Sequence, residues 1–285
     1  MRPQRTIRRT VTLEGKGIHA GRDVKVTIKS APPNTGIRFI RTDLKDRPSI
    51  TADVSNLSDY SNKLRCTSLG KDKAAVHTAE HLLAALNGLN IDNADIEIDN
   101  TEPPMLDGSA LVYAAEINKA GSVEQDKKRL ELCIKEAVWE KDDNALLMAV
   151  PSDTFKVSYM LHYDEPDFPA QYVEFSLDSG KKKEEIFLKE IAPARTYCLE
   201  KEVALIMALR LGKGADYKTA LVIKNGKPVK NEFRLKDEPA RHKVLDLLGD
   251  LSLLNTEIKA HVIGVKSGHA LNAKFVKKLA KLQAQ

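Results

Sequence analysis

The clearest pattern of hydrophobic and polar positions lies in residues 237–254, DEPARHKVLDLLGDLSLL. Its leucines and valine recur at helical spacing and share one broad arc at about 100° per residue. His242, Asp246 and Asp250 follow one another at intervals of four, so they form a line on the other side of the predicted helix, beside Lys243. Most such lines of polar residues face solvent. A histidine followed by an aspartate one turn later is also typical of a metal or catalytic pair.

Similar patterns predict a second leucine-rich helix, and alternating positions predict strands around both helices. The first half of the chain shows strands, then a helix, then a strand, and the second half repeats this order. The predicted elements are strands over 22–29 and 36–41, a helix over 77–89, a strand over 93–99, a strand over 155–163, a helix over 237–254 and a strand beginning at 261.

The two predicted helices resemble each other when they are laid side by side. AEHLLAALNG and ARHKVLDLLG share four residues in register, namely Ala79 with Ala240, His81 with His242, Leu86 with Leu247 and Gly88 with Gly249. A match this short can arise by chance, but the order of elements around both helices is also the same. We therefore expect an α+β fold of two domains with similar topology. Each would be a β-sheet with helices on one face, with the helical layers packed between two outer sheets.

The polar stretch KAGSVEQDKK divides the two halves and has the composition of a linker. We expect an N-terminal domain over residues 1–120, a linker over 121–128 and a C-terminal domain over 129–285. If the helical layers face each other, His81 and His242 reach one crevice between the domains, where binding sites commonly lie.

Three residues would form a metal site in that crevice. His81, His242 and Asp246 give a His₂Asp set with an open fourth position, which is the pattern of catalytic zinc, because structural zinc sites close with four protein ligands. Glu80 lies beside a ligand and is placed to take a proton from metal-bound water. Asp250, one turn beyond Asp246, can hold a further group as an outer partner.

His269 in KSGHALN is the candidate for that further group, because Ser267 and Gly268 mark a turn from which its imidazole can project into the crevice. A surface histidine in a turn is the alternative. His19, in the glycine-rich turn GKGIHAG, is a weaker candidate for lining the site. The remaining histidines are expected to be structural, and these are His77, His162 and His261.

The composition is that of a soluble globular protein, and the chain has no run of about 18 apolar residues that could span a membrane. The N-terminal segment MRPQRTIRRT lacks the apolar core of a secretory signal, so we expect a cytoplasmic protein. Three cysteines, odd in number and without metal-finger spacing, are expected to be reduced and mostly packed. Aromatic residues make up only 5% of the chain and no recognition motif occurs, so no nucleic-acid partner is expected.

The net charge is +5, with lysines concentrated in SGKKKEE and in KFVKKLAKLQAQ. This balance fits an anionic small-molecule substrate or a weak peripheral contact with an anionic membrane. A solvated basic surface is the alternative for both clusters. We expect a monomer.

The segment PARTYCLEKEVALIMALRLGKG (193–214) carries apolar residues around almost the whole circumference of a short helix. These residues are Leu199, Val203, Leu205, Ile206, Met207, Leu209 and Leu211. Such a helix is either buried on all sides or lines something apolar. Burial is the more frequent outcome and an acyl-chain passage is the more specific one, and composition does not choose between them.

Several segments, in this order and spacing, resemble the UDP-3-O-acyl-N-acetylglucosamine deacetylases, zinc enzymes of lipid A synthesis in Gram-negative bacteria. They are TAEHLLAAL, LDGSA, IAPART, DEPARHKVLDLLGDL and KSGHALN. The resemblance covers essentially the whole chain and points to the stand-alone form of the enzyme. It implies that the substrate is a UDP-linked acylated amino sugar, UDP-3-O-(3-hydroxyacyl)-N-acetylglucosamine, from which the N-acetyl group is removed as acetate.

The resemblance also implies a role for each matching residue. The implied zinc ligands are His81, His242 and Asp246; the general base is Glu80; the general acid is His269, oriented by Asp250; the oxyanion contact is Thr196; and the substrate contacts are Lys243, Tyr197, Leu199, Leu205 and His19. An apolar insert near residues 193–222 would line the acyl passage. The family commonly has aromatic residues after PART, where this chain has Tyr197, Cys198 and Leu199, so its sugar contacts and acyl-length preference stay open.

Two other functions remain open on the residues alone. Another zinc amidase or esterase would use the same His₂Asp set. A peptide substrate would then predict an open groove, whereas the apolar segment favours a lipid tail. A basic binding module without enzymatic activity would bind no metal, so elemental analysis of the purified protein would separate it from an enzyme.

Overall fold

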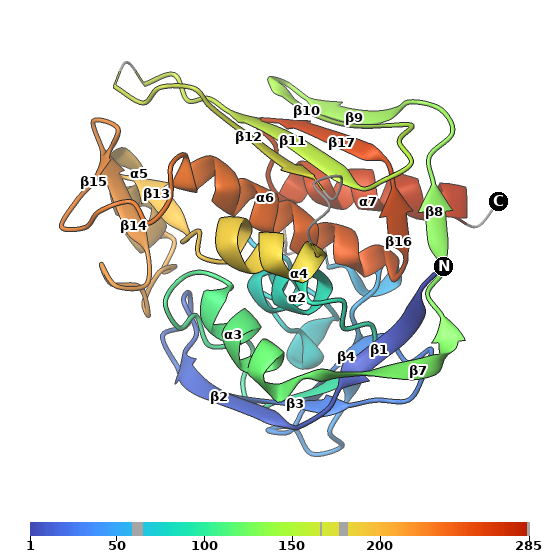
Figure 1. Cartoon of the computed structure of the whole chain (residues 1–285). Helices are drawn as coiled ribbons and strands as arrows, with labels where there is room; N and C mark the ends of the chain where they lie inside the picture. The colour runs from blue at the N-terminus through green and yellow to red at the C-terminus, as the bar shows by residue number, and fades with distance from the viewer. Residues whose placement is uncertain (59–64, 166, 177–181, 284–285) are drawn as a thin grey trace.

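The computed structural model describes residues 1–58, 65–165, 167–176 and 182–283. Two five-stranded sheets form the outer layers of the molecule, and the main helices lie between them (Figure 1). This is the α+β arrangement that the repeated pattern predicts, with the helical layers enclosed by the sheets.

The first sheet is built from the N-terminal part of the chain. Its strands are β2 (Val11–Lys16), β3 (Asp23–Ser30), β6 (Ala94–Ile98), β4 (Ile37–Arg41) and β5 (Ser49–Thr51), in this spatial order. Only β6 and β4 are parallel neighbours, and the other neighbours are antiparallel. Val24, Val26 and Ile28 alternate along β3 and are buried on its inner face, as the period-two pattern predicts.

The second sheet has the same topology as the first. Its strands are β9 (Val138–Asp142), β10 (Ala145–Val150), β17 (His261–Val265), β11 (Lys156–Leu161) and β12 (Gln171–Ser176), again in spatial order. Here too the third and fourth strands, β17 and β11, are parallel and all other neighbours are antiparallel.

The helices occupy equivalent places in the two halves. In each half, one helix precedes the central strand and one follows it. In the first half, α2 (Glu80–Gly88) precedes β6 and α3 (Leu111–Ala120) follows it. In the second half, α6 (Glu238–Leu251) precedes β17 and α7 (His269–Gln283) follows it. The matching strand order and helix positions confirm two α+β units of common design. The register of His81 with His242 therefore reflects equivalent positions on equivalent helices.

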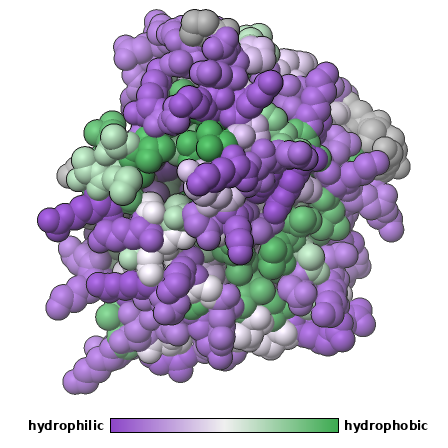
Figure 2. All heavy atoms as spheres, turned by 90° about the vertical axis from the view of Figure 1, so that its left-hand side faces the viewer, coloured by the Kyte–Doolittle hydropathy of each residue, from purple (hydrophilic) through white to green (hydrophobic). Residues whose placement is uncertain are grey.

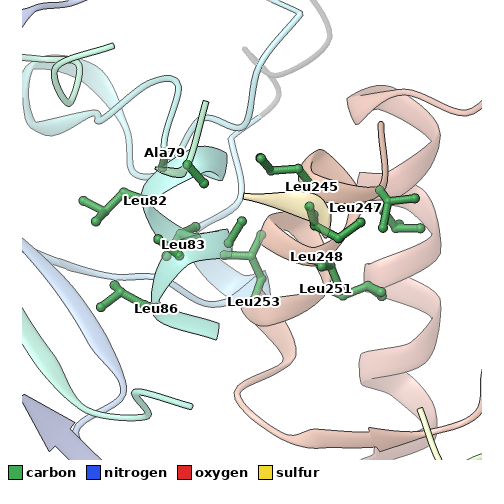
Figure 3. Close-up of a cluster of buried hydrophobic side chains, with 14 of the residues drawn as sticks. Ala79, Leu82, Leu83, Leu86, Leu245, Leu247, Leu248, Leu251 and Leu253 are labelled. Atoms are coloured by element: carbon green, nitrogen blue, oxygen red, sulfur yellow. The ribbon is translucent and has the colours of Figure 1, made fainter. Parts of the chain in front are cut away.

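Helices α2 and α6 pack directly against each other in the middle layer. Figure 3 shows Leu83 of α2 facing Leu248 and the following Leu253, while Leu82 and Leu86 point away from α6. A glycine permits the close approach, because a Cβ at Gly249 would lie 2.3 Å from the backbone oxygen of Glu80. The contact therefore brings the first turn of α2 against the polar line of α6.

The stretch 121–128, which its composition predicts as a linker, is mostly a strand. β7 (Ser122–Lys128) pairs antiparallel with β1 (Pro3–Ile7). Most of its side chains are exposed, which explains the polar composition, and its pairing partner lies about 120 residues earlier, so local sequence does not reveal it. A second small pair joins β8 (Glu131–Cys133) to β16 (Glu257–Lys259).

Ion pairs join the N-terminal segment to both halves of the molecule. Arg2 donates to Asp92 in the first half at 2.7 Å and contacts Glu257 in the second half at 3.1 Å. Arg129 contacts the same Asp92 at 3.1 Å. We call these four residues the arginine clasp. It lies at the right-hand end of the helical layer in Figure 1, where the N-terminus is marked.

An insert projects at the opposite end of the helical layer (Figure 1). It consists of β13 (Tyr197–Leu199), α5 (Glu200–Ala208), β14 (Leu221–Lys224) and β15 (Lys227–Pro228), with β13 and β14 parallel. It therefore extends beyond the predicted limits of 193–222. No residue of α5 is buried, so of the two alternatives left open by its composition, burial on all sides does not hold for this helix.

The remaining elements are short. They are α4 (Lys183–Ile186), the π-helical turn η3 (Phe187–Ile191) and the 3₁₀ turns η1 (Val54–Asn56), η2 (Asp72–Ala74) and η4 (Ser252–Leu254). Among the described residues, every helix is too short or too polar to cross a membrane.

Candidate metal centre and active site

The packing of α2 on α6 assembles the site. Glu80 and His81 are the first two residues of α2, and His242, Asp246 and Asp250 occupy successive turns of α6. All five side chains are buried. The structure thus brings residues separated by about 160 positions into one place between the two halves.

His81, His242 and Asp246 form a compact cluster. The Nε2 atom of His242 lies 3.3 Å from Oδ1 of Asp246, and Nε2 of His81 lies 3.8 Å from the same oxygen. One candidate ligand atom from each residue lies within 4.8 Å of the other two. The imidazole of His242 is oriented by its Nδ1, which lies 3.1 Å from the carbonyl oxygen of Ala194 and donates to it in the neutral tautomer that leaves Nε2 free.

The chemistry of this donor set fits a metal ion. Burial lowers the pKa of His81 to about 3 and also lowers that of His242, so both imidazoles are neutral. Although burial opposes it, the positive charges around Asp246 hold the pKa of that carboxyl well below its usual value. Oδ1 of Asp246 is buried without a hydrogen-bond partner among the described residues. A divalent cation requires ligands of this kind, namely two neutral imidazoles and an ionised carboxylate with an unsatisfied buried oxygen.

Glu80 lies beside the cluster as a carboxylate with one oxygen held and one free. Oε2 accepts a hydrogen bond of 2.9 Å from the backbone N–H of Thr67, and Oε1 lies 3.7 Å from Nε2 of His269. Burial raises the pKa of Glu80 to about 7. A carboxylate with this pKa is matched to proton transfer near neutral pH.

His269 begins helix α7, whereas the turn before it had suggested a loop position. Its Nδ1 lies 3.0 Å from Oδ2 of Asp250, and its Nε2 lies 3.7 Å from Asp246 and faces the cluster. Burial alone lowers the pKa of His269, but the carboxylates of Asp250 and Glu80 outweigh it and raise the pKa to about 9. The imidazole is therefore protonated at neutral pH and directs an N–H toward the site.

Two further residues belong to this network and were not identified from the sequence. Thr67 donates its hydroxyl to Oδ1 of Asp250, and that hydroxyl lies 3.2 Å from Nδ1 of His269. Asn272 donates to Oδ2 of Asp250 at 2.7 Å. Asn272 follows His269 by three positions, a helical spacing that could have revealed it. No pattern in RCTSLG points to Thr67.

A cavity of about 150 Å³ opens onto the cluster. The sequence-predicted residues that line it are His19, Glu80, His81, Thr196, Tyr197, His242, Lys243, Asp246 and His269. An apolar wall continues from them, made by Ile18, Met105, Ile206 and Leu211. Two large aliphatic side chains of the apolar segment, Ile206 and Leu211, thus reach the site.

Two predicted substrate contacts lie elsewhere. Leu199 is buried in β13 and lines a neighbouring cavity with Phe168 and Ile223. Leu205 is 60% exposed and does not line the cavity at the metal cluster. The helical pattern could not separate these residues from Ile206, because it marks apolar positions without showing which of them face the cavity.

Lys243 lines both this cavity and a second, neighbouring cavity of about 480 Å³. Its Nζ donates to Asp246 at 2.8 Å and lies 5.7 Å from the centre of the Tyr197 ring. Both cavities are lined by Arg65, Lys243 and His269, and the second also by Lys266. Asp142 and Asp143 also line the second cavity, with Asp142 paired to Lys274, so this side of the site contains one more lysine but also two carboxylates.

Thr196 is held at the cavity by its backbone. Its N–H donates to the carbonyl oxygen of Gly108 at 2.7 Å, and its own carbonyl oxygen accepts from the N–H of Leu221 at 2.9 Å. The side chain lines the cavity at the metal cluster. This anchoring fixes the hydroxyl-bearing residue relative to the insert and to the segment around Gly108.

The three histidines expected to be structural stay outside the cluster. His77 and His261 lie within 2.9 Å and 2.8 Å of serine hydroxyls, and His162 lies 3.8 Å from Asp164. The cysteines are all free, but only Cys66 is buried, Cys198 is half-buried and Cys133 is exposed. Packing of the cysteines is thus less complete than expected.

Comparison with known proteins identifies the family. A sequence model described as UDP-3-O-acyl N-acetylglycosamine deacetylase matches residues 4–281. The UDP-3-O-acyl-N-acetylglucosamine deacetylases of Chlamydia abortus and Myxococcus xanthus are 38% and 37% identical to this chain over 98% of it, and it covers 97% and 88% of their lengths. A bifunctional enzyme LpxC/FabZ of Chlorobaculum tepidum is 39% identical over 98% of this chain, which spans 64% of that longer protein. The chain belongs to the UDP-3-O-acyl-N-acetylglucosamine deacetylase family.

Proposed function

We propose that this chain is a Zn²⁺-dependent deacetylase that hydrolyses the N-acetyl group of UDP-3-O-(3-hydroxyacyl)-N-acetylglucosamine to acetate and a free amine. The relatives carry this deacetylase activity in their names. The observation that carries the proposal is the convergence of His81, His242 and Asp246 with Glu80 and His269 in one buried site. The reaction is expected to take place in the cytoplasm, by a monomeric enzyme.

His81, His242 and Asp246 would hold the metal. A Zn²⁺ ion in such a site supplies a Lewis acid that polarises the acetyl carbonyl and makes a water molecule more acidic. Two imidazole nitrogens and one carboxylate oxygen are ligands that zinc prefers, and three protein ligands leave a position open for substrate.

Glu80 is the proposed general base. It takes a proton from the attacking water while the water oxygen bonds to the acetyl carbon. Its Oε2 is occupied by the Thr67 N–H, so Oε1 is the oxygen available for this proton. His269 is the proposed general acid and gives the proton on Nε2 to the amine nitrogen as the C–N bond breaks. Asp250 accepts from its other ring nitrogen and so orients the imidazole.

Thr196 and Lys243 would bind the substrate around the reacting carbon. The Thr196 hydroxyl would donate to the acetyl oxygen as negative charge develops there, and Thr196 lines the cavity. Arg65, Lys243 and Lys266 line the adjoining cavity, together with Asp142 and Asp143, and the three cations would bind the diphosphate of a UDP-sugar. On the opposite side, Ile206 and Leu211 would contact the acyl chain.

Product analysis tests the proposal. The purified, zinc-loaded chain is incubated with UDP-3-O-(3-hydroxyacyl)-N-acetylglucosamine, and mass spectrometry follows the release of acetate and of the amine. A chelator should abolish product formation, and added Zn²⁺ should restore it. UDP-N-acetylglucosamine without the acyl chain serves as the second substrate, and each methylene that the apolar wall buries is worth about 0.8 kcal/mol. Turnover of this substrate should therefore be far less efficient.

Two results would contradict the proposal. A zinc-loaded wild-type chain that releases no acetate from the acylated substrate is not this deacetylase. Equal turnover of both substrates would contradict the acyl-binding role of the apolar wall. It would favour another zinc amidase or esterase with the same ligands.

A further inference from the structure

Helix α5 ends in an exposed apolar surface. Leu205, Met207 and Leu209 are 60%, 69% and 57% exposed, although they lie within five positions of one another. We call these three residues the α5 tip. Figure 2 shows the side of the molecule on which the insert lies, where hydrophobic residues interrupt the polar surface. Large exposed apolar side chains near the end of one short helix are typical of an interaction site.

Basic residues follow the α5 tip directly. Arg210, Lys213 and Lys218 are exposed, and the sequence contains no acidic residue between Glu202 and Asp216. Within the described part of the chain, Arg210 and Lys213 form no ion pair. The Asp216 carboxylate is engaged locally, because it accepts from the backbone N–H of Lys218 at 2.7 Å. The surface is thus apolar at its tip and positively charged at its rim.

The same helix also reaches the cavity of the metal cluster. Ile206 lies between Leu205 and Met207 in sequence and lines that cavity, as does Leu211. Helix α5 packs mainly on β13 and β14, so its end projects away from the two sheets. This segment therefore presents apolar side chains both to the cavity and to solvent.

We propose that the α5 tip docks onto the surface of an anionic phospholipid membrane. Leu205, Met207 and Leu209 would enter the interface between headgroups and acyl chains. Arg210, Lys213 and Lys218 would contact the lipid phosphates. An apolar face beside basic residues is the combination that binds a helix to such a surface, with no need to span it.

Charge favours a lipid surface over a second copy of this chain. Two copies joined through the α5 tips would bring two basic rims together, and Asp216, whose carboxylate is engaged locally, is the one acidic residue in the sequence between Glu202 and Lys218. An anionic bilayer instead offers negative charge and an apolar interior in the same geometry. If the chain has the proposed function, docking would also bring the acylated substrate close to Ile206 and Leu211; this consequence of docking rests on the proposed function.

The lysine clusters that the sequence suggested for a membrane contact are less suitable. In KFVKKLAKLQAQ, Lys274 pairs with Asp142 at 3.0 Å and Lys278 pairs with Glu140 at 2.9 Å. In SGKKKEE, residues 179–181 lie outside the described part of the chain, and Lys183 donates to Asn87 at 2.9 Å from a partly buried position. The structure therefore moves the expected membrane contact to the insert.

The test is co-sedimentation of the full chain with vesicles of phosphatidylcholine, with and without phosphatidylglycerol. We expect binding to the anionic vesicles that weakens at high salt. Met207→Ser/Leu209→Ser should weaken it at least about tenfold, because two apolar side chains no longer enter the interface. Arg210→Glu/Lys213→Glu should also weaken it at least about tenfold, since each basic residue near the surface is worth about 1 kcal/mol, or about fivefold.

Matched variants make the same change in apolar content or in charge at other places on the surface. Leu130→Ser/Met160→Ser removes the same two residue types from exposed positions outside the insert, and Lys45→Glu/Lys135→Glu reverses two exposed lysines elsewhere. Both should bind like wild type, and thermal unfolding verifies that every variant is folded.

Absence of vesicle binding by wild type, or equal losses in the matched variants, overturns the proposal. A dimer that Met207→Ser/Leu209→Ser converts to a monomer, without vesicle binding, would show an interface between copies instead. Vesicle binding needs no turnover, so a chain that binds lipid without releasing acetate would contradict only the proposed deacetylation.

Discussion

Thr67 contacts the proposed base and the carboxylate behind the proposed acid at the same time. Its backbone N–H holds Glu80, and its hydroxyl donates to Asp250. Thr67→Val keeps the shape but removes the hydroxyl, so Asp250 loses a donor and His269 is oriented less firmly. A hydrogen bond to a charged group is worth about 1.5–3 kcal/mol, so we expect kcat to fall roughly 10- to 100-fold.

Steady-state kinetics and zinc analysis of the Thr67 variants separate positioning from folding. KM and zinc content should stay near their wild-type values in Thr67→Val, and Thr67→Ser, which restores the hydroxyl, should recover most of kcat. A loss confined to KM, or an equal loss in Thr67→Ser, would argue against the positioning role.

The ionisation of two residues predicts how activity depends on pH. Burial raises the pKa of Glu80 to about 7, and the carboxylates around His269 raise its pKa to about 9 against the effect of burial. Activity needs Glu80 ionised and His269 protonated, so kcat/KM should rise with pH through the first pKa and fall through the second. The positive charge of a bound metal ion lowers both values, which moves the whole bell to lower pH.

Asp250→Asn tests the basic limb of this profile. It removes the nearest carboxylate to His269, so the fall in kcat/KM should begin at lower pH, while the acidic limb changes less. The measurement is kcat/KM across pH for wild type and variant at equal zinc content. A basic limb that does not move would mean that another group limits activity there.

At the scale of elements, the contact between α2 and α6 decides whether the site exists. A Cβ at position 249 would lie 2.3 Å from the Glu80 backbone oxygen, so Gly249→Ala forces the helices apart. We expect a loss of about 1–3 kcal/mol in the free energy of unfolding, as for other overpacked positions, together with weaker zinc binding. Thermal unfolding and zinc titration measure both effects.

Gly268→Ala provides the control, because a Cβ there meets no atom within 4 Å. Its free energy of unfolding should stay close to that of wild type. An equally stable Gly249→Ala variant with unchanged zinc affinity would show that the helices can adjust without disturbing the ligands.

The elements also show what the sequence could predict. Helices α2 and α6 were predictable because their leucines are buried at helical spacing, and their shared residues revealed the repeated design. Strand β7 was not, because its partner β1 is distant in the chain and its own side chains are polar and exposed. The exposed end of α5 was also not predictable, since its apolar composition left burial and an apolar passage as alternatives and cannot show that the insert projects from the domain.

The candidate site was predictable to a similar extent. The residue types and spacing on α6, together with the family resemblance, pointed to the cluster and to His269. The sequence could not show that Leu199 and Leu205 lie outside the cavity at the metal cluster, because the side of a short segment that faces a cavity depends on how the insert packs. Thr67 was missed because its contribution comes from its position beside three other residues and from no local pattern.

For the molecule as a whole, equivalent helices contribute different chemistry. His81 and His242 occupy the same place, but Ala85 stands where the second helix has Asp246, and Leu82 where it has Lys243. In the proposed enzyme, the first half would therefore contribute one ligand and the general base. The second half would contribute two ligands and the substrate-binding Lys243, so neither half would form the centre alone.

A metal held by both halves should stabilise the whole fold. A ligand that binds only the folded chain adds about 2.7 kcal/mol at a hundredfold excess over its Kd. We expect the thermal unfolding midpoint to fall when a chelator removes Zn²⁺ and to recover when Zn²⁺ is added. His242→Ala should unfold at a midpoint that neither treatment changes. A wild-type midpoint that is indifferent to Zn²⁺ would contradict a shared metal centre.

The arginine clasp has a mechanical consequence. The two halves are joined by Arg2, Asp92, Arg129 and Glu257 at one end of the helical layer and, in the proposed enzyme, by metal ligands toward the other. Two halves that are joined at both ends of their interface cannot open by a hinge motion at either end. Substrate and product would therefore pass through the side, between the insert and the second cavity, while the two sheets keep a fixed separation throughout the catalytic cycle.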